Sequence, residues 1–115
     1  MDQNTPRAVE ACHELLLWLI PLLDQFPRSR RFTLGERIEK LLLSVLEGLI
    51  QAAYSRDKRD ALARANRELE VTRHLWRLCH ELRVIPGRRY EHGARLLDDI
   101  GRQLGGWLRA QGARA

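Results

Sequence analysis

The sequence has 115 residues, of which 44% are hydrophobic and 30% charged, so it can bury a core as one domain without disulfides or a bound metal. Twenty Lys and Arg residues against fifteen Asp and Glu give a formal net charge of +5, which suits nucleic acid, an acidic protein or an anionic membrane surface. Two cysteines exclude a disulfide framework, and the apolar stretch at residues 15–23 is too short to cross a bilayer.

The two cysteines, Cys12 and Cys79, both fall in apolar helical repeats, where a free thiol behaves as a small hydrophobe. Residues 1–4 are polar and do not follow the basic-then-apolar order of a signal peptide. We therefore expect a reducing cytoplasm as the location and no membrane partner.

The first predicted helix covers residues 6–26. Thr5 and Pro6 are typical of a helix start, with Thr5 as the cap and Pro6 at the first helical position. Pro21 lies inside this segment and should kink the helix, because proline removes one backbone hydrogen bond. Spacings of four and three keep one face of the helix apolar. The residues of that face are Ala8, Cys12, Leu15, Leu19, Leu22 and Phe26.

An arginine-rich corner follows this helix. Pro27 ends the helix because it lacks an N–H and biases its neighbour away from helical dihedral angles. Arg28, Arg30 and Arg31 then come close together, with no acidic residue before Glu36. Such a corner is either a solvated turn or a phosphate site, and composition alone favours the solvated turn.

The corner also predicts how the chain continues. Thr33 is expected to cap the second helix, with Glu36 three residues later completing a capping box. Phe26 and Phe32 bracket the corner, and we expect both rings to anchor it to the core.

The remaining helices are predicted at residues 33–54, 57–82 and 87–110. The apolar stripe of the second contains Leu34, Ile38, Leu41, Val45 and Leu49. The third begins after Asp57, a candidate cap, and its stripe contains Leu62, Ala65, Leu69, Thr72, Trp76 and Cys79. Ile85, Pro86 and Gly87 make the next corner. The stripe of the fourth helix contains Tyr90, Gly93, Leu97, Ile100, Leu104 and Trp107.

This pattern predicts an all-α protein, because no segment shows the two-residue alternation of a strand. Four amphipathic helices joined by short connections are typical of an up-down-up-down four-helix bundle. We expect residues 1–115 to form a single such domain.

The apolar stripes are wider than the interior of one bundle needs, which favours a homo-oligomer over a monomer. The residues without an obvious place inside are Trp18, Ile20, Leu43, Leu75 and Leu78. Gly105 and Gly106 precede Trp107 within the fourth helix. These glycines either lie in a fraying last turn or keep a surface flat for another backbone, with Trp107 as the anchor.

Catalytic interpretations find little support in the sequence. Glu10 and His13 have the spacing of a metal-binding bundle helix, but no second pair exists and both point away from the predicted interior face. There is no phosphate-cradling loop and no serine with evident triad partners. We therefore expect no enzyme, no catalytic residue, no metal site and no cofactor.

Basic side chains on the second and third helices could merge with the corner into one surface, since these helices are neighbours in a bundle. The candidate nucleic-acid-binding residues are Arg28, Arg30, Arg31, Arg37, Lys40, Arg64, Arg67, Arg73 and Arg77. Ion pairs within the third helix would neutralise part of this surface, at only about 0.2–0.5 kcal/mol per pair. The expected pairs are Glu70 with Arg73 or His74, and Arg77 with Glu81. The excess of base favours contact with the nucleic-acid backbone over reading of bases.

These residues also carry a family resemblance. The corner Phe26-Pro27-Arg28-Ser29, followed by Arg31-Phe32-Thr33-Leu34-Gly35 and Arg37-Ile38, resembles the signature of the accessory variability determinant proteins of diversity-generating retroelements. Further similarities are Ala65-Asn66, Leu69, Arg73, Arg77-Leu78, Tyr90, Ile100-Gly101-Arg102 and Leu104-Gly105-Gly106-Trp107. Gln103 and the Pro86-Gly87 corner depart from the family pattern.

The resemblance implies a four-helix-bundle protomer that assembles as a barrel-like homopentamer and has no enzymatic activity of its own. It further implies association with a reverse transcriptase and its template RNA, with DNA as another candidate partner, in support of mutagenic cDNA synthesis and homing. The basic positions that it matches are Arg28, Arg31, Arg37, Arg73, Arg77 and Arg102. The alternative is a protein-interaction scaffold whose basic surface docks an acidic protein partner.

Overall fold

The computed structural model describes residues 6–113, which form four long helices and a short helical corner. The elements in chain order are α1 (Arg7–Leu23), α2 (Arg28–Arg30), the π-helical turn η1 (Arg31–Gly35), α3 (Glu36–Tyr54), α4 (Arg59–Glu81) and α5 (Gly87–Ala113). No strand occurs within residues 6–113. The prediction of an all-α bundle is confirmed.

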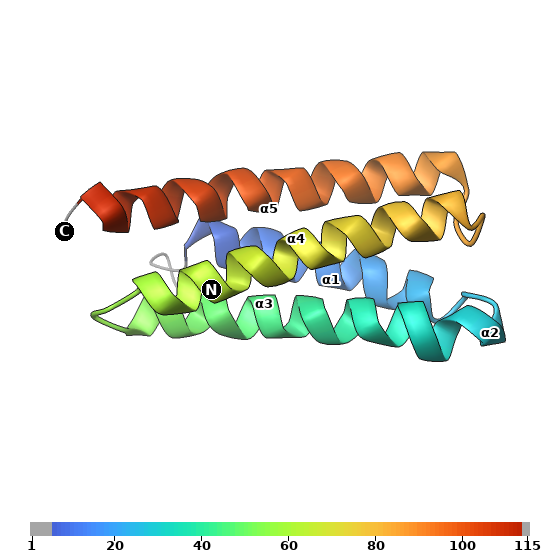
Figure 1. Cartoon of the computed structure of the whole chain (residues 1–115), viewed down its shortest axis with the longest axis horizontal. Helices are drawn as coiled ribbons and strands as arrows, with labels where there is room; N and C mark the ends of the chain where they lie inside the picture. The colour runs from blue at the N-terminus through green and yellow to red at the C-terminus, as the bar shows by residue number, and fades with distance from the viewer. Residues whose placement is uncertain (1–5, 114–115) are drawn as a thin grey trace.

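The four long helices lie side by side in a molecule measuring 45 × 27 × 23 Å (Figure 1). Each long helix packs against two others: α1 against α3, α3 against α4, α4 against α5, and α5 against α1. The α1–α3 corner and the α4–α5 connection meet at one end, on the right of Figure 1, and the α3–α4 connection lies at the other. Neighbouring helices therefore alternate in direction.

The core runs along the centre of the bundle and contains side chains from every long helix. The largest fully buried residues are Leu15, Leu19, Leu23, Ile38, Leu42, Val45, Leu49, Leu62, Leu69, Trp76, Ile100 and Leu104. Most of these residues belong to the predicted apolar stripes, because burial of one face stabilises each helix more than intrinsic propensity does. Burying a leucine of this kind contributes about 2 kcal/mol.

The first helix begins one residue later than predicted. Pro6 is the cap residue and has extended backbone angles, so Arg7 is the first helical residue. Thr5, the predicted cap, lies outside the described residues. The helix continues through Pro21 and ends at Leu23, since the proline lies in its last turn.

The predicted capping box at Thr33 is wrong. The chain is already helical after Pro27, whose carbonyl oxygen accepts the N–H groups of Arg30 and Arg31 at 2.8 and 2.9 Å. The hydroxyl of Thr33 instead donates toward the carbonyls of Ser29 and Arg30, both at 3.3 Å. Pro27 acts as a helix start, because its fixed φ suits the residue that precedes the first turn. The corner is therefore a helical segment that leads through η1 directly into α3.

The two phenylalanines of the corner behave differently. Phe26 is buried and packs under Gly35, where an added Cβ would lie 3.4 Å from the Phe26 ring. Phe32 is 57% exposed, which contradicts the expectation that it anchors the corner. Phe32 lies off the apolar stripe that leads from Leu34 to Ile38, so it faces solvent beside Arg31.

The α3–α4 connection is fixed by side chains. The ammonium group of Lys58 donates to the carbonyls of Ala52 and Ser55 at 2.7 and 2.6 Å, which satisfies the free end of α3. Asp57, the candidate cap, accepts the N–H of Arg59 at 3.2 Å. Both contacts hold the antiparallel turn from α3 into α4.

The α4–α5 connection closes α4 with a Schellman motif. Arg83 has φ of 62°, and its N–H donates to the carbonyl of His80 at 3.0 Å. The N–H of Val84 donates to the carbonyl of Cys79 at 2.9 Å, which completes the pair of bonds. An arginine therefore occupies a left-handed position that usually takes glycine.

No helix within the described residues combines the length and the apolar composition that a membrane-crossing segment needs.

Candidate nucleic-acid interface

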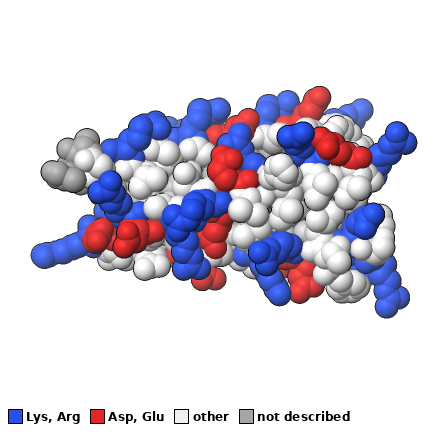
Figure 2. Space-filling view, viewed as in Figure 1, with Lys and Arg blue, Asp and Glu red and all other residues white. Residues whose placement is uncertain are grey.

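Positive charge is concentrated at one end of the bundle. Residues 24–40 and 77–95, which lie on both sides of the α1–α3 and α4–α5 connections, form what we call the basic end. These segments carry ten Lys and Arg against five Asp and Glu, whereas the rest of the chain carries ten against ten. The formal charge of +5 is thus the charge of the basic end. In Figure 2, basic side chains protrude at this right-hand end and also at the left-hand end, while acidic and basic side chains adjoin each other over the middle of the face.

The arginines of the helical corner have no ion pair within residues 6–113. Arg28 and Arg30 are exposed on α2, and Arg31 lies in η1 with its guanidinium carbon 4.7 Å from the centre of the Phe32 ring. The charge of Arg30 counteracts the burial that raises the pKa of Cys79, which lies in the last turn of α4. The corner therefore offers three guanidinium groups and one exposed aromatic ring to a partner.

Four of the predicted residues on α4 and α5 are paired with acids instead: Arg64, Arg73, Arg77 and Arg102. Arg73 donates to Glu70 on its own helix at 2.8 Å and pairs with Asp98 on α5 at 2.7 Å, so it links two helices. Arg77 pairs with Glu81 at 2.9 Å. Both pairs predicted within the third helix, Glu70 with Arg73 and Arg77 with Glu81, are present.

The ion pair between Arg77 and Glu81 shifts the pKa of both groups. The hydrogen bond to Glu81, reinforced by the opposite charge, raises the pKa of Arg77. The same contact lowers the pKa of the Glu81 carboxyl. Both side chains are exposed, so the pair contributes little to stability.

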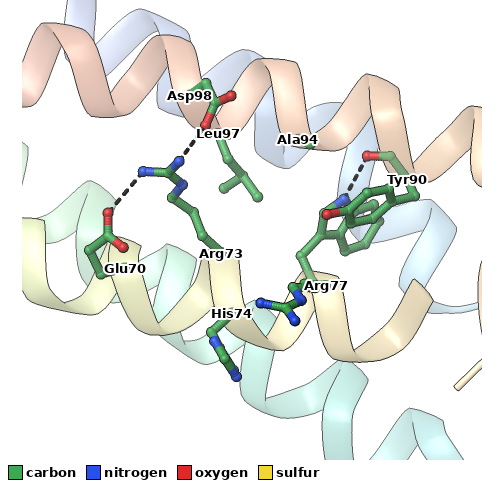
Figure 3. A pocket seen from close by; sticks show the side chains of 9 residues that line it. Glu70, Arg73, His74, Arg77, Tyr90, Ala94, Leu97 and Asp98 are labelled. Atoms are coloured by element: carbon green, nitrogen blue, oxygen red, sulfur yellow. Dashed lines mark hydrogen bonds and ion pairs between the residues drawn. The ribbon is translucent and has the colours of Figure 1, made fainter. Parts of the chain in front are cut away.

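A hollow of about 330 Å³ lies between α4 and α5 around these arginines (Figure 3). Its polar lining comes from Glu70, Arg73, His74, Arg77, Tyr90 and Asp98. The carbonyl of Tyr90 accepts the indole N–H of the buried Trp76 at 2.9 Å. Figure 3 shows Arg73 held between its two carboxylates, so a phosphate would have to compete with both acids there.

The other predicted basic residues lie in several places. Arg37 and Lys40 follow the corner on α3, where Lys40 pairs with Glu36 at 3.2 Å and Arg37 has no ion pair within the described chain. Arg64 and Arg67 lie on the first half of α4, away from the basic end. Arg102 lies on α5 and pairs with Asp99 at 3.3 Å. The ten residues therefore do not form one continuous surface, and Arg28, Arg30, Arg31 and Arg37 are the group that the fold brings together without acid partners.

Arg64 belongs to a polar link between helices. The hydroxyl of Ser44 on α3 donates to Glu68 at 2.7 Å and accepts a hydrogen bond from Arg64 at 3.1 Å. Arg64 is also within 3.7 Å of the Glu68 carboxylate. The guanidinium group of Arg64 thus helps to hold α3 against α4.

The residues predicted for a partner or oligomer interface also lie in different environments. Ile20 and Leu43 line an apolar hollow of about 370 Å³ between α1 and α3, together with Leu17, which is 60% exposed. Leu78 is 37% exposed on α4. Trp18 and Leu75 are partly buried against the core, and Trp18 also lines a surface hollow beside α5.

The glycine pair near the end of the chain lies within a continuous helix. The helix α5 runs to Ala113, so Gly105 and Gly106 are not in a fraying last turn. A Cβ added at either glycine would meet, among described atoms, only the side chain of Arg109, at 3.4 and 3.8 Å. Contacts inside the protomer therefore do not require these glycines. Trp107 packs beside the start of α1.

Residues 6–113 contain no group of three or more potential metal ligands. Burial raises the pKa of Cys12 to about 12 and that of Cys79 to about 11. Both thiols are buried, so they pack as small hydrophobes and are poorly reactive.

The sequence interpretation missed several functional candidates at the basic end. Arg88, Arg89 and Arg95 on α5 have no ion pair within residues 6–113 and surround His92. The spacing 88, 92 and 95 places three of these residues on one helical face, which was a signal available in the sequence. Leu17, outside the basic end, was also missed. Its position off the apolar stripe of α1 was the signal available for it.

The fold and this surface define a small, all-helical bundle protein with a basic end and no evident catalytic group among the described residues. A family model described as bAvd-like matches residues 8–111, nearly the whole chain. The chain therefore belongs to the bAvd-like family, that of the accessory variability determinant proteins, which are known as accessory and non-catalytic. No curated protein and no solved structure matches the chain significantly.

Proposed function

We propose that this protein is a noncatalytic, nucleic-acid-binding accessory protein of a diversity-generating retroelement. It associates with the reverse transcriptase and the template RNA, and it supports mutagenic cDNA synthesis and homing. Membership of the bAvd-like family over residues 8–111 supports this role. The observation that carries it is the basic end, where Arg28, Arg30 and Arg31 have no acid partner among the described residues.

The chemistry of the basic end suits a phosphate backbone. Guanidinium groups bind phosphate through two parallel hydrogen bonds, and free guanidinium groups need not first leave a carboxylate. The exposed Phe32 ring beside Arg31 adds a flat apolar surface of the kind that nucleotide bases stack on. Binding through such contacts releases counterions and carries little sequence preference.

We also propose that the protein works as a homo-oligomer, with the homopentamer of its family as the expected assembly. The apolar hollow at Leu17, Ile20 and Leu43 and the exposed Leu78 support a self-interface. Gly105 and Gly106 support a close approach by a second backbone, because the described residues of the protomer place no other element against them. Size-exclusion chromatography with light scattering measures the oligomer directly.

The test of nucleic-acid binding is fluorescence anisotropy with a labelled RNA over a range of salt concentrations. The variant Arg28→Ser/Arg30→Ser should weaken binding about ten-fold or more and reduce the salt slope by roughly one to two units. The matched control is Arg56→Ser/Arg59→Ser, which removes the same charge at the other end of the bundle. Its affinity should stay within about two-fold of wild type.

Two outcomes contradict the proposal. Equal losses in both double variants mean that net charge alone governs binding, and a titration that is flat in salt means that no phosphate contacts form. If an acidic protein displaces the RNA and itself binds more tightly, the alternative of a scaffold that docks an acidic partner is favoured. A pull-down with the reverse transcriptase tests the partner separately.

We place the protein in the cytoplasm. Its two cysteines are free, buried and shifted toward the neutral thiol, which agrees with a reducing compartment. Fractionation of cells that express the protein tests this location.

A further inference from the structure

A second basic hollow lies on the other side of α5 from the hollow of Figure 3, which we call the groove. It has a volume of about 280 Å³ and is lined by Trp18, Arg88, Arg89, His92 and Arg95. Residues 88, 92 and 95 share one face of α5, whereas Tyr90, Ala94 and Leu97 line the groove toward α4. The two sites therefore use opposite faces of the same helix.

The aromatic wall of this hollow is fixed from behind. The rings of Trp18 and His92 meet edge to face with their centres 4.7 Å apart. Trp18 also contacts the ring of Trp76, 6.2 Å away at an angle of 70°. Trp76 is only 1% exposed, and its hydrogen bond to the Tyr90 carbonyl holds its orientation. A ligand at the hollow thus meets rings that are already in place, which reduces the entropy lost on binding.

The positive charge around the wall is available. Arg88, Arg89 and Arg95 are exposed and form no ion pair within residues 6–113, unlike Arg73 and Arg77 in the groove. Arg88 and Arg95 are two helical turns apart, a separation of about 10 Å along α5. They can therefore contact phosphates on either side of a group that rests against the rings.

We infer that this hollow is a site for single-stranded nucleic acid, in which one base stacks on the ring of Trp18 with His92 at its edge, while Arg88 and Arg95 bind the flanking phosphates. The inference rests on the proposed nucleic-acid binding and adds a preference for unpaired strands. A base inside a duplex is stacked and paired on both sides, so only a splayed base can reach the rings. Any base has a flat face, so the site selects strand state and carries little sequence preference.

The experiment compares two labelled 12-nucleotide strands of equal charge, oligothymidine and a strand of abasic sites, by anisotropy with the full chain. Wild type should bind oligothymidine about ten-fold more tightly than the abasic strand. Trp18→Leu should remove this difference and leave abasic binding unchanged, while Trp18→Phe, which keeps a ring, should retain it. Circular dichroism and thermal melting check that each variant is folded.

Trp18 is partly buried, so a second variant guards against misfolding. His92 is exposed, and His92→Ala should lower the base-dependent difference by several-fold without changing the melting temperature. Arg88→Ser/Arg95→Ser should weaken both strands and lower the salt slope by roughly one to one and a half units, whereas the Arg56→Ser/Arg59→Ser control should not.

The results separate this inference from the proposed function. If oligothymidine and the abasic strand bind equally, or if the difference survives in both Trp18→Leu and His92→Ala, the stacking site is overturned while nucleic-acid binding stands. If a duplex of the same length competes better than oligothymidine, the preference for unpaired strands is overturned. If neither strand binds, the inference fails, and the titration with labelled RNA decides the proposed function separately.

Discussion

The two ends of the bundle contain similar residues, but their Lys and Arg side chains take part in different contacts. At the α3–α4 end, Lys58 caps a helix and Arg64 joins Ser44 and Glu68, so these two cations serve the fold. At the basic end, Arg28 and Arg30 stand outside any ion pair of the described chain. The comparison teaches that the number of arginines says less about a binding surface than the acids within their reach.

The largest effect tests whether the basic end depends on its rigid aromatic interior. A Cβ added at Gly93 would lie 2.6 Å from the Trp76 ring, so Gly93→Ala must displace that ring or α5. We expect a loss of about 2–3 kcal/mol in the free energy of unfolding, measured by urea denaturation. Gly112 has nothing within 4 Å in the described structure, and Gly112→Ala should be neutral or stabilising by up to about 1 kcal/mol. Equal effects at the two glycines would contradict this packing.

The thiols of Cys12 and Cys79 test the difference between the rest of the bundle and the basic end, because their protonation depends on pH. Cys12 lies outside the basic end, and burial raises its pKa from 9.0 to about 12. Between these values the unfolded thiol loses its proton while the folded thiol keeps it, so stability is complete below pH 9 and falls as pH rises. Relative to Cys12→Ala, wild type should lose about 2 kcal/mol by pH 11.

Cys79 provides the matching measurement at the basic end. Its pKa is raised less, to about 11, because Arg30 opposes the effect of burial. Arg30→Ser should therefore slow alkylation of Cys79 above pH 9 and leave Cys12 unchanged. An equal change at both thiols would contradict the effect of the Arg30 charge on Cys79.

A smaller effect tests whether acid pairing keeps the groove arginines from nucleic acid. Asp98→Asn frees one side of Arg73, and we expect RNA affinity to rise about two- to five-fold, on the order of 0.5–1 kcal/mol. Asp60→Asn adds the same charge at the opposite end of α4, where Asp60 has no ion pair within residues 6–113. If both substitutions raise affinity equally, net charge and not release of Arg73 is responsible.

The smallest effect concerns the α4–α5 connection, which is part of the basic end. Arg83 occupies a left-handed conformation at the end of α4, which glycine adopts without strain. Arg83→Gly should raise the free energy of unfolding by about 0.5 kcal/mol, because relief of strain exceeds the entropy lost by glycine. Arg89→Gly, within the first turn of α5, should instead destabilise the protein.

Helix periodicity made most of the fold predictable. The stripes of Leu62, Leu69 and Trp76 or of Leu97, Ile100 and Leu104 are buried as expected, because helical spacing fixes which residues share a face. Thr33 was misassigned because the helix-starting role of Pro27 competed with a capping-box pattern and prevailed.

The candidate site was less predictable, because pairing across helices depends on tertiary structure. Local pairs such as Arg77 with Glu81 follow from sequence spacing, and they were predicted. The contact of Arg73 with Asp98 joins residues 25 positions apart, and no helical spacing reveals it. The position of Trp18 beside Arg88 likewise depends on how α1 and α5 pack.

The helical form of the α1–α3 corner has a consequence for proteolysis. Trypsin cleaves after arginine, but it must draw several residues into an extended conformation, so helical segments resist nicking while exposed non-helical connections do not. Arg28 and Arg30 lie in α2 and Arg31 lies in η1, whereas Arg56 and Arg83 lie in the non-helical α3–α4 and α4–α5 connections. Limited digestion should therefore cut near Arg56 and Arg83 while it leaves the arginine-rich corner intact.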